Sequence, residues 1–283
     1  MVIYVHTINL EGFNIRTDMV IEEDPSFNLD SKKVKVIESR KGRNRSFVTI
    51  SFNDITDKDN YQKVLDQMIL SLTKLLEKEK IKQEDSCLVI GLGNSFSTPD
   101  SLGPKTIEKV LVTRHLFTFG DVEKGYRSVA CFIPGVTGVT GIETNDTITS
   151  LVKKIKPDFL IVIDALASSK IKHLTKIIQI ANTGITPGSG IGNRREKITK
   201  ERLKIPVIVI GVPTVVDEVT IVDDVIKSIG IKISKEKINE AIIPLDYNMI
   251  VTPKDIDFKI EKLSSLIASS LNHVLHPNYN STK

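Results

Sequence analysis

The sequence predicts an α/β fold of three layers, with a mostly parallel or mixed sheet that carries helices on both faces. Short, continuous apolar runs recur through the chain, which is the pattern of strands buried on both faces. Segments with helical spacing of apolar residues lie between several of these runs, which is the order expected of an α/β domain. The apolar runs cover residues 87–90, 129–133, 159–163, 177–180 and 207–210.

The remaining elements are predicted from local patterns in chain order. Residues 1–26 indicate an extended arm, and residues 31–52 alternate as two strands would. Over 57–80, apolar residues recur every three to four positions, which predicts an amphipathic helix. Thr252 and Pro253 are typical of a helix start, with Thr as the N-cap and Pro at the first helical position. Further helices are expected at 103–115, 142–156 and 215–228.

Length and charge limit the classes of function. The chain has 283 residues, with 39 Lys and Arg against 35 Asp and Glu and a formal net charge of +4. This length is ample for a buried core, and the charge is too small to indicate a nucleic-acid partner. Charged residues interrupt every window long enough to span a bilayer, and the N-terminus lacks the pattern of a signal peptide. We therefore expect a cytoplasmic protein with no membrane contact.

The sequence carries no cofactor or metal signature. Cys87 and Cys131 lack the spacing of a zinc site and are expected to be small buried apolar residues. The five histidines show no ligand spacing. Gly91 and Gly93 are followed by Phe96 where the dinucleotide-binding fingerprint needs a third glycine. We therefore expect no cofactor.

Two aspartates follow predicted strands, at the positions where functional groups gather in open α/β sheets. Asp100 lies in the loop after run 87–90, just before a helix, and Asp164 follows run 159–163. One ionised carboxyl group can take a proton from water while a protonated partner polarises a peptide carbonyl. The pair is thus a candidate for acid–base peptide hydrolysis, while a helix N-cap at Asp100 and a structural acid at Asp164 are the alternatives.

Two loops rich in Gly, Thr and Pro, 182–193 and 211–217, follow later apolar runs. Backbone N–H groups in such loops can approach an extended peptide or an oxyanion, and simple turn formation is the alternative. Ser189 lacks the G-x-S-x-G frame of a serine nucleophile. The candidate supporting residues are Asn94, Thr98, Gly188, Ser189 and Gly190.

Long motifs in one order, from about residue 87 onward, resemble those of the germination protease family of spore-forming bacteria. These endopeptidases degrade small acid-soluble spore proteins. The motifs include G-L-G-N at 91–94, T-P-D at 98–100, P-G-V-T-G at 134–138, I-D-A-L-A at 163–167, P-G-S-G at 187–190 and G-V-P-T-V-V-D at 211–217.

The resemblance implies an atypical aspartic endopeptidase whose two essential aspartates correspond to Asp100 and Asp164. It also implies a zymogen made during sporulation, located in the forespore or spore core, and assembled as a homotetramer. The implied fold is similar to that of the hydrogenase maturation proteases. On this interpretation, residues 1–283 form a single α/β peptidase domain with a propeptide-like arm of about residues 1–18.

The N-terminal motif R-T-D-M-V-I-E at 16–22 is similar to the family's processing region, R-T-D-L-A-x-E. Family cleavage favours an acid followed by a hydrophobic residue, so the resemblance points to autoprocessing between Asp18 and Met19. Val20 departs from the usual Ala. Residues 42–50 stand where the family usually carries a longer segment with a G-K-P-x-G-x-Y-x-T-like element, which is a second departure.

Two other functions are compatible with the sequence. One is a metal-dependent protease of the hydrogenase-maturation type, whose acids occupy comparable strand ends and whose third ligand is a histidine. The other is a non-catalytic module that binds a small ligand through its Gly-rich loops. Loss of activity with a chelator would favour the first, and ligand binding without hydrolysis would favour the second.

Overall fold

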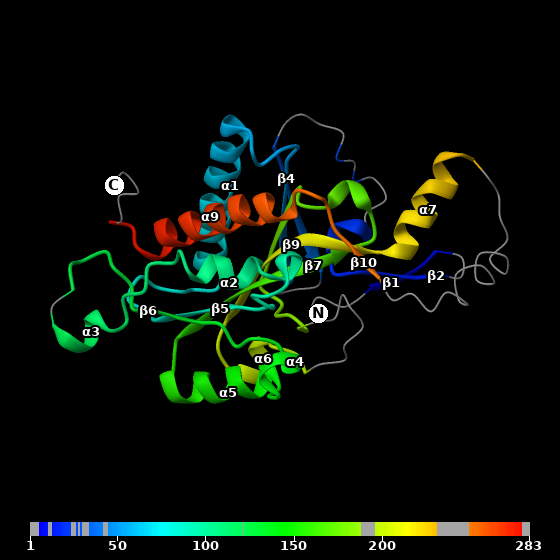
Figure 1. Ribbon diagram of the computed structural model, residues 1–283. Coiled ribbons are helices and arrows are strands. Elements are labelled where there is room, and N and C mark those ends of the chain that lie inside the picture. The colour runs from blue at the N-terminus through cyan, green and yellow to red at the C-terminus, as the bar shows by residue number, and fades with distance from the viewer. Residues whose placement is uncertain are drawn as a thin grey trace.

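Among the residues that the computed structural model describes, eight strands form the main sheet (Figure 1). The described residues are 6–10, 13–23, 27, 29, 34–41, 45–120, 122–187, 196–230 and 249–278. Across the sheet the order is β3 (Lys35–Lys41), β4 (Arg45–Ser51), β8 (Ile177–Ala181), β9 (Val207–Asp217), β7 (Phe159–Ser168), β5 (Cys87–Gly91) and β6 (Val129–Phe132), and β10 (Ile250–Val251) also pairs with β9. A separate hairpin of β1 (His6–Leu10) and β2 (Phe13–Thr17) lies in the predicted arm.

The sheet is mixed. Strands β9, β7, β5 and β6 run parallel to their neighbours in that series. The pairs β3–β4, β4–β8, β8–β9 and β9–β10 are antiparallel. This arrangement confirms the predicted α/β fold with a mixed sheet.

Helices cover both faces of the sheet (Figure 1). On one face lie α1 (Lys58–Lys78), α2 (Leu102–Ile107) and α9 (Ile256–Leu275), and on the other lie α5 (Thr144–Ile155) and α6 (Lys200–Leu203). The shorter or peripheral helices are η1 (Val20–Glu23), η2 (Thr98–Asp100), α3 (Leu116–Phe119), α4 (Thr137–Thr140), η3 (Ile171–His173) and α7 (Glu218–Ser228). Within the described part of the chain, no helix is both long and apolar enough to span a bilayer.

The continuous apolar runs are explained by two core clusters, one on each face of the sheet. Along β7, Phe159 and Ile161 pack in the cluster beneath α1 and α9, while Leu160 and Val162 pack in the cluster beside α5. Successive side chains of a strand point to opposite faces, so a strand covered on both sides must be apolar at every position.

Two strands continue beyond their predicted ends. β7 reaches Ser168 and β9 reaches Asp217, so Asp164 lies inside a strand rather than after it. The extension is possible because the two strands pair with each other as far as Ser168 and Val216, through one irregularity after Leu166. The loop predicted at 211–217 and the first residues of the helix predicted at 215–228 are therefore wrong; that helix begins at Glu218.

The helix predicted at 103–115 is also shorter than expected, because backbone N–H groups in its second half donate hydrogen bonds to residues that are distant in the sequence. α2 ends at Ile107, and the N–H group of Leu111 donates to Asn272 Oδ1 in α9 at 2.8 Å. The N–H group of Thr113 donates to the carbonyl oxygen of Val129 at 3.0 Å. The predicted N-cap at Thr252 is wrong as well, because α9 begins at Ile256 with Asp255 at the N-cap position, and the hydroxyl of Thr252 donates to the carbonyl of Thr214 instead.

Replacing Asn272 by Ala is expected to lower the free energy of unfolding by about 1–3 kcal/mol, because partly buried backbone groups lose their partner. Asn272 is buried, accepts from the N–H of Leu111, and donates from Nδ2 to the carbonyl of Lys109 at 3.1 Å. Chemical denaturation measures the change. The control is Ser265→Ala, whose exposed hydroxyl donates to the carbonyl of Glu261 within the same helix. Equal stability of both variants would contradict the prediction.

Candidate active site

A cavity of about 360 Å³ opens at the carboxyl ends of β5 and β7. Asp100 and Asp164 both line this cavity, although they lie far apart in the sequence. Gly135 and Val136 after β6, and Thr214 and Val215 of β9, contribute further walls. Ligands in open α/β sheets bind at this edge of the strands.

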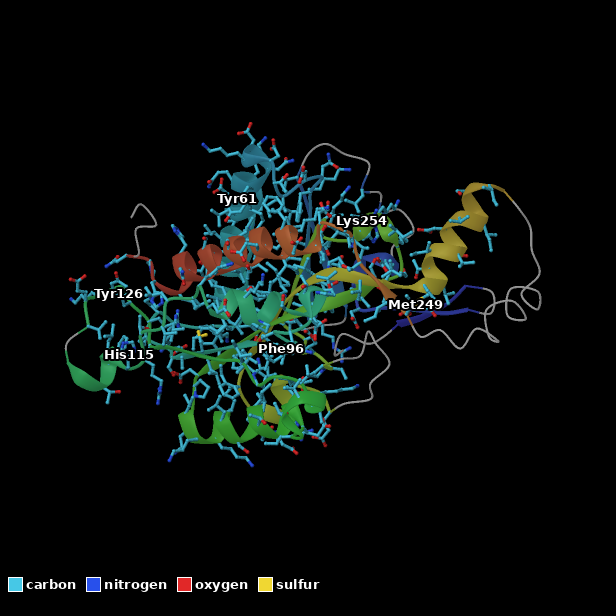
Figure 2. All side chains as sticks on the ribbon, in the orientation of Figure 1. Tyr61, Phe96, His115, Tyr126, Met249 and Lys254 are labelled. Atoms are coloured by element: carbon cyan, nitrogen blue, oxygen red, sulfur yellow. The ribbon has the colours of Figure 1, made fainter. Side chains whose placement is uncertain are left out.

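Asp100 is positioned by the loop that follows β5. The N–H group of Asn94 donates to Asp100 Oδ2 at 2.9 Å and also to the carbonyl oxygen of Asp100 at 3.1 Å. Gly93 has a φ of +114°, and a Cβ at this position would lie 1.9 Å from the carbonyl oxygen of Asp100. The chain can therefore fold this tightly around Asp100 only with glycine at position 93. Phe96, which is 88% exposed, projects from the same loop (Figure 2).

Asp164 is placed by the sheet itself. It lies in β7, is 7% exposed, and alternates onto the face that also carries Val162 and Leu166. In register, Asp164 is opposite Gly211 of β9, and Gly211 is opposite Gln179 of β8. Asp164 and Gln179 thus belong to one row across three strands, with their Cα atoms roughly 9–10 Å apart by the usual strand spacing.

The N-terminal arm reaches the same cavity. Asp18 is buried and lines the cavity beside Asp100 and Asp164, and none of the described lining residues is basic. The N–H group of Asp18 donates to the carbonyl of Ala167 at 3.0 Å, and the N–H group of Ala167 donates to Asp18 Oδ2 at 2.9 Å. Met19 follows with a fully buried side chain. The predicted processing bond therefore lies at the cavity that holds the two predicted catalytic acids.

Gln179 holds the backbone of the arm on either side of Met19. Its Nε2 atom donates to the carbonyl oxygen of Asp18 at 3.3 Å, and its Oε1 atom accepts from the N–H group of Val20 at 2.8 Å. Gln179 is 1% exposed, so it makes these contacts where water cannot compete. An amide side chain used in this way substitutes for the backbone pairing of a neighbouring strand.

Glu22, further along the arm, is enclosed by polar groups after β7. Its Oε1 atom lies 2.5 Å from His173 Nδ1 and accepts from the hydroxyl of Ser168. Its Oε2 atom accepts from the N–H group of Ser169 at 2.8 Å and from the hydroxyl of Ser169 at 2.5 Å. Burial acts to raise the pKa of Glu22, but the hydrogen bonds and charge of His173 and the two serine hydroxyls lower it below its ordinary value.

Of the residues predicted from the sequence to support the two acids, the structure places only some at the cavity. Asn94 lines the cavity, whereas Thr98 begins η2, where its carbonyl accepts from the N–H group of Ser101, and is not among the described lining residues. Gly188, Ser189 and Gly190 lie outside the described residues, although Pro187 just before them lines the cavity.

Sequence reasoning missed Gln179, Ser168, Ser169 and the contact of His173 with Glu22. One signal was present, because Gln179 is the single polar residue in an otherwise apolar strand. A buried polar residue in such a strand needs a hydrogen-bonding partner, which here comes from the arm. Across the described residues, no cluster of three or more His, Cys, Asp or Glu side chains is arranged to hold a metal ion.

Comparison with known proteins matches residues 9–237 and 231–283 to the family described as germination protease. The chain is 38% identical to the germination protease of Geobacillus sp. (strain WCH70), covering 97% of this chain and 86% of that protein. It is 35% identical to the germination protease of Halalkalibacterium halodurans, covering 98% and 97% of the two chains.

Among solved structures, the chain is similar to the [NiFe] hydrogenase maturation protease HycI from Thermococcus kodakarensis KOD1. The TM-score is 0.38 and the sequence identity is 15%, over 71% of this chain and 98% of that chain.

Proposed function

This chain belongs to the germination protease family, and we propose from that premise that it starts the degradation of small acid-soluble spore proteins during germination. We further propose that Asp100 and Asp164 carry out the hydrolysis. The observation that supports this most directly is that both acids line one cavity, Asp100 from the loop region after β5 and Asp164 from the neighbouring parallel strand β7.

The proposed reaction needs one proton shared between the two carboxyl groups. Two carboxyl groups that line the same cavity favour such sharing, because two like charges repel, and none of the described lining residues is basic. The ionised aspartate takes a proton from water as the water oxygen attacks the peptide carbonyl carbon. The protonated aspartate gives its proton to the carbonyl oxygen, which produces a tetrahedral diol.

Collapse of the diol breaks the C–N bond. The carboxyl group that gained a proton from water now donates one to the departing nitrogen, and the other carboxylate takes a proton from a diol hydroxyl. The products are a carboxylic acid and an amine, and the pair again holds one proton. Asn94 supports this chemistry by fixing Asp100 through its backbone N–H group.

We also propose that the chain is made as a zymogen and processes itself between Asp18 and Met19. The arm supports this proposal because Asp18 lines the cavity and its carbonyl accepts from Gln179. We further propose that the chain assembles as a homotetramer and is located in the forespore or spore core.

Incubation of the purified chain, once it has been processed between Asp18 and Met19, with an acid-soluble spore protein, followed by mass spectrometry of the products, tests the proposed activity. Endopeptidase fragments are expected, and no fragments at any pH would contradict the function. A strong chelator is expected to leave the cleavage rate unchanged, because the two carboxyl groups activate water without a metal ion. Complete loss of activity, restored by a single metal ion, would instead support the metal-dependent alternative.

A further inference from the structure

We infer that Thr214 binds the peptide substrate by donating a hydrogen bond from its side-chain hydroxyl to a backbone carbonyl oxygen of the peptide. The inference rests on the proposed peptidase function and adds a residue of β9 to the site. The observation behind it is a buried hydroxyl at the wall of the cavity. Thr214 lines the cavity and is 1% exposed, and its Oγ1 atom has no hydrogen-bond partner among the described residues.

Thr214 occupies the irregularity in the pairing of β7 with β9. Leu166 of β7 lies opposite Pro213, and Ala167 lies opposite Val215, so Thr214 has no residue opposite it in β7. An extra residue of this kind interrupts the alternation of side chains along a strand and can turn a side chain in a new direction. Such irregularities are common next to active sites. Position 214 is therefore a place where β9 can present a side chain to the cavity.

The backbone around Thr214 is held in place, so the uncommitted group is the side chain. The carbonyl oxygen of Thr214 accepts from the hydroxyl of Thr252 at 2.8 Å. The carbonyl oxygen of the preceding residue, Pro213, accepts from the N–H group of Thr175 at 2.7 Å. Rotation about χ1 moves the hydroxyl between staggered positions without moving this backbone. The hydroxyl can therefore turn toward a ligand that fills the cavity.

The other hydroxyl groups that line the cavity have partners of their own or access to water. The hydroxyl of Thr144 donates to the carbonyl oxygen of Gly135 at 3.3 Å, and Ser97 is partly exposed. A buried hydroxyl without a partner disfavours the folded state, whereas a valine of nearly the same shape carries no such penalty. Stability alone therefore does not explain threonine at position 214, and a bound peptide would supply the missing partner.

The chemistry of the cavity favours a carbonyl oxygen as that partner. Asp18, Asp100 and Asp164 line the cavity, and carboxylate groups accept hydrogen bonds. A peptide brings one carbonyl acceptor with each residue, so it needs donors from the wall. A threonine hydroxyl can donate to a carbonyl whatever side chains the peptide carries. Thr214 therefore positions the peptide backbone and does not select a particular sequence.

Thr214→Val tests the inference, because it removes the hydroxyl and keeps the shape of the side chain. For cleavage of an acid-soluble spore protein by the processed enzyme, kcat/KM is expected to fall by about 5- to 100-fold. Most of the loss is expected in KM, because the carbonyl loses its donor in the bound substrate as well as in the transition state. Initial rates over a range of substrate concentrations measure both constants. Thr214→Ser keeps the hydroxyl and is expected to retain activity.

Thermal unfolding separates this role from a structural one. Without a peptide the hydroxyl of Thr214 has no described partner, so the Tm of Thr214→Val is expected to be unchanged or higher. The matched control is Thr220→Val in α7. Thr220 is 0% exposed, its Oγ1 atom also has no described partner, and it is not among the described residues that line the cavity. This control is expected to keep its kcat/KM, with a Tm that is unchanged or higher.

Equal kcat/KM for Thr214→Val and Thr220→Val would overturn the inference while leaving the proposed function intact. An equal loss in Thr214→Ser and Thr214→Val would also overturn it, because the hydroxyl would then not be the group responsible. Intact mass confirms that each chain has been processed. Failure of Thr214→Val alone to process is a loss of the same activity and would support the inference. Absence of any cleavage by the unmodified enzyme would reject the proposed function itself, and the inference with it.

Discussion

Replacement of either Asp100 or Asp164 by Asn is expected to reduce the rate of spore-protein cleavage by at least about 10³-fold, because an amide neither accepts nor donates the required proton. Asn has the shape of Asp, so the hydrogen bond from the N–H of Asn94 to position 100 keeps an oxygen acceptor. Initial rates followed by mass spectrometry of the fragments measure the loss. Thermal unfolding is expected to change little.

The matched control for both variants is Asp59→Asn. Asp59 is an exposed acid in the first turn of α1 and is not among the described residues that line the cavity. This control is expected to retain full activity. If the Asn variants at 100 and 164 both cleaved at the rate of the control, the aspartate pair would be rejected as the catalytic machinery.

Gly93→Ala is the second change expected to have a large effect. It combines a strained positive φ with a Cβ placed 1.9 Å from the carbonyl oxygen of Asp100. We expect a loss of about 2–4 kcal/mol in the free energy of unfolding, from backbone strain and overpacking together. Because the clash is with the backbone of Asp100, cleavage activity is expected to fall even at temperatures where the variant stays folded.

Gly120→Ala provides the comparison for this prediction. A Cβ at Gly120 meets no atom within 4 Å, and its φ of 169° is extended backbone that any residue adopts. Differential scanning calorimetry and cleavage rates measured below the transition separate stability from activity. Unchanged activity and stability in Gly93→Ala would show that the loop around Asp100 is less constrained than its geometry requires.

The central strands of the fold could be predicted because their burial on both faces leaves a local trace in the sequence. The runs at 159–163 and 207–210 are apolar at every position, and each lies in a strand packed on both sides. The prediction of a helix over 103–115 was wrong in its second half. The backbone N–H groups there donate to Asn272 and Val129, which are distant in the sequence, and no local pattern reveals these partners. The predicted ends of β7 and β9 were wrong for the same reason, because pairing between the two strands extends both of them.

The candidate site could be predicted only in part. Asp100 and Asp164 follow apolar runs, and their convergence on one cavity could be predicted from topology, although Asp164 lies within β7 rather than after it. The partners of the arm could not be found in this way, because Gln179 is 159 residues from Val20 and His173 is 151 residues from Glu22 in the sequence. Nothing in the local sequence distinguishes Ser168 and Ser169 from other polar residues, because their role depends on contacts with Glu22 of the arm.

The row formed by Gln179, Gly211 and Asp164 has a consequence for how tightly the site can bind a peptide. The three residues are held by ladders of backbone hydrogen bonds between β8, β9 and β7, so their separation is fixed when the protein folds. This part of the site is therefore already ordered before a peptide binds. Binding then loses no conformational entropy at these three residues, so no such loss weakens the affinity for the peptide. Substitutions in surface loops should consequently leave unchanged the spacing between Asp164 and Gln179, whose amide holds the backbone of the arm.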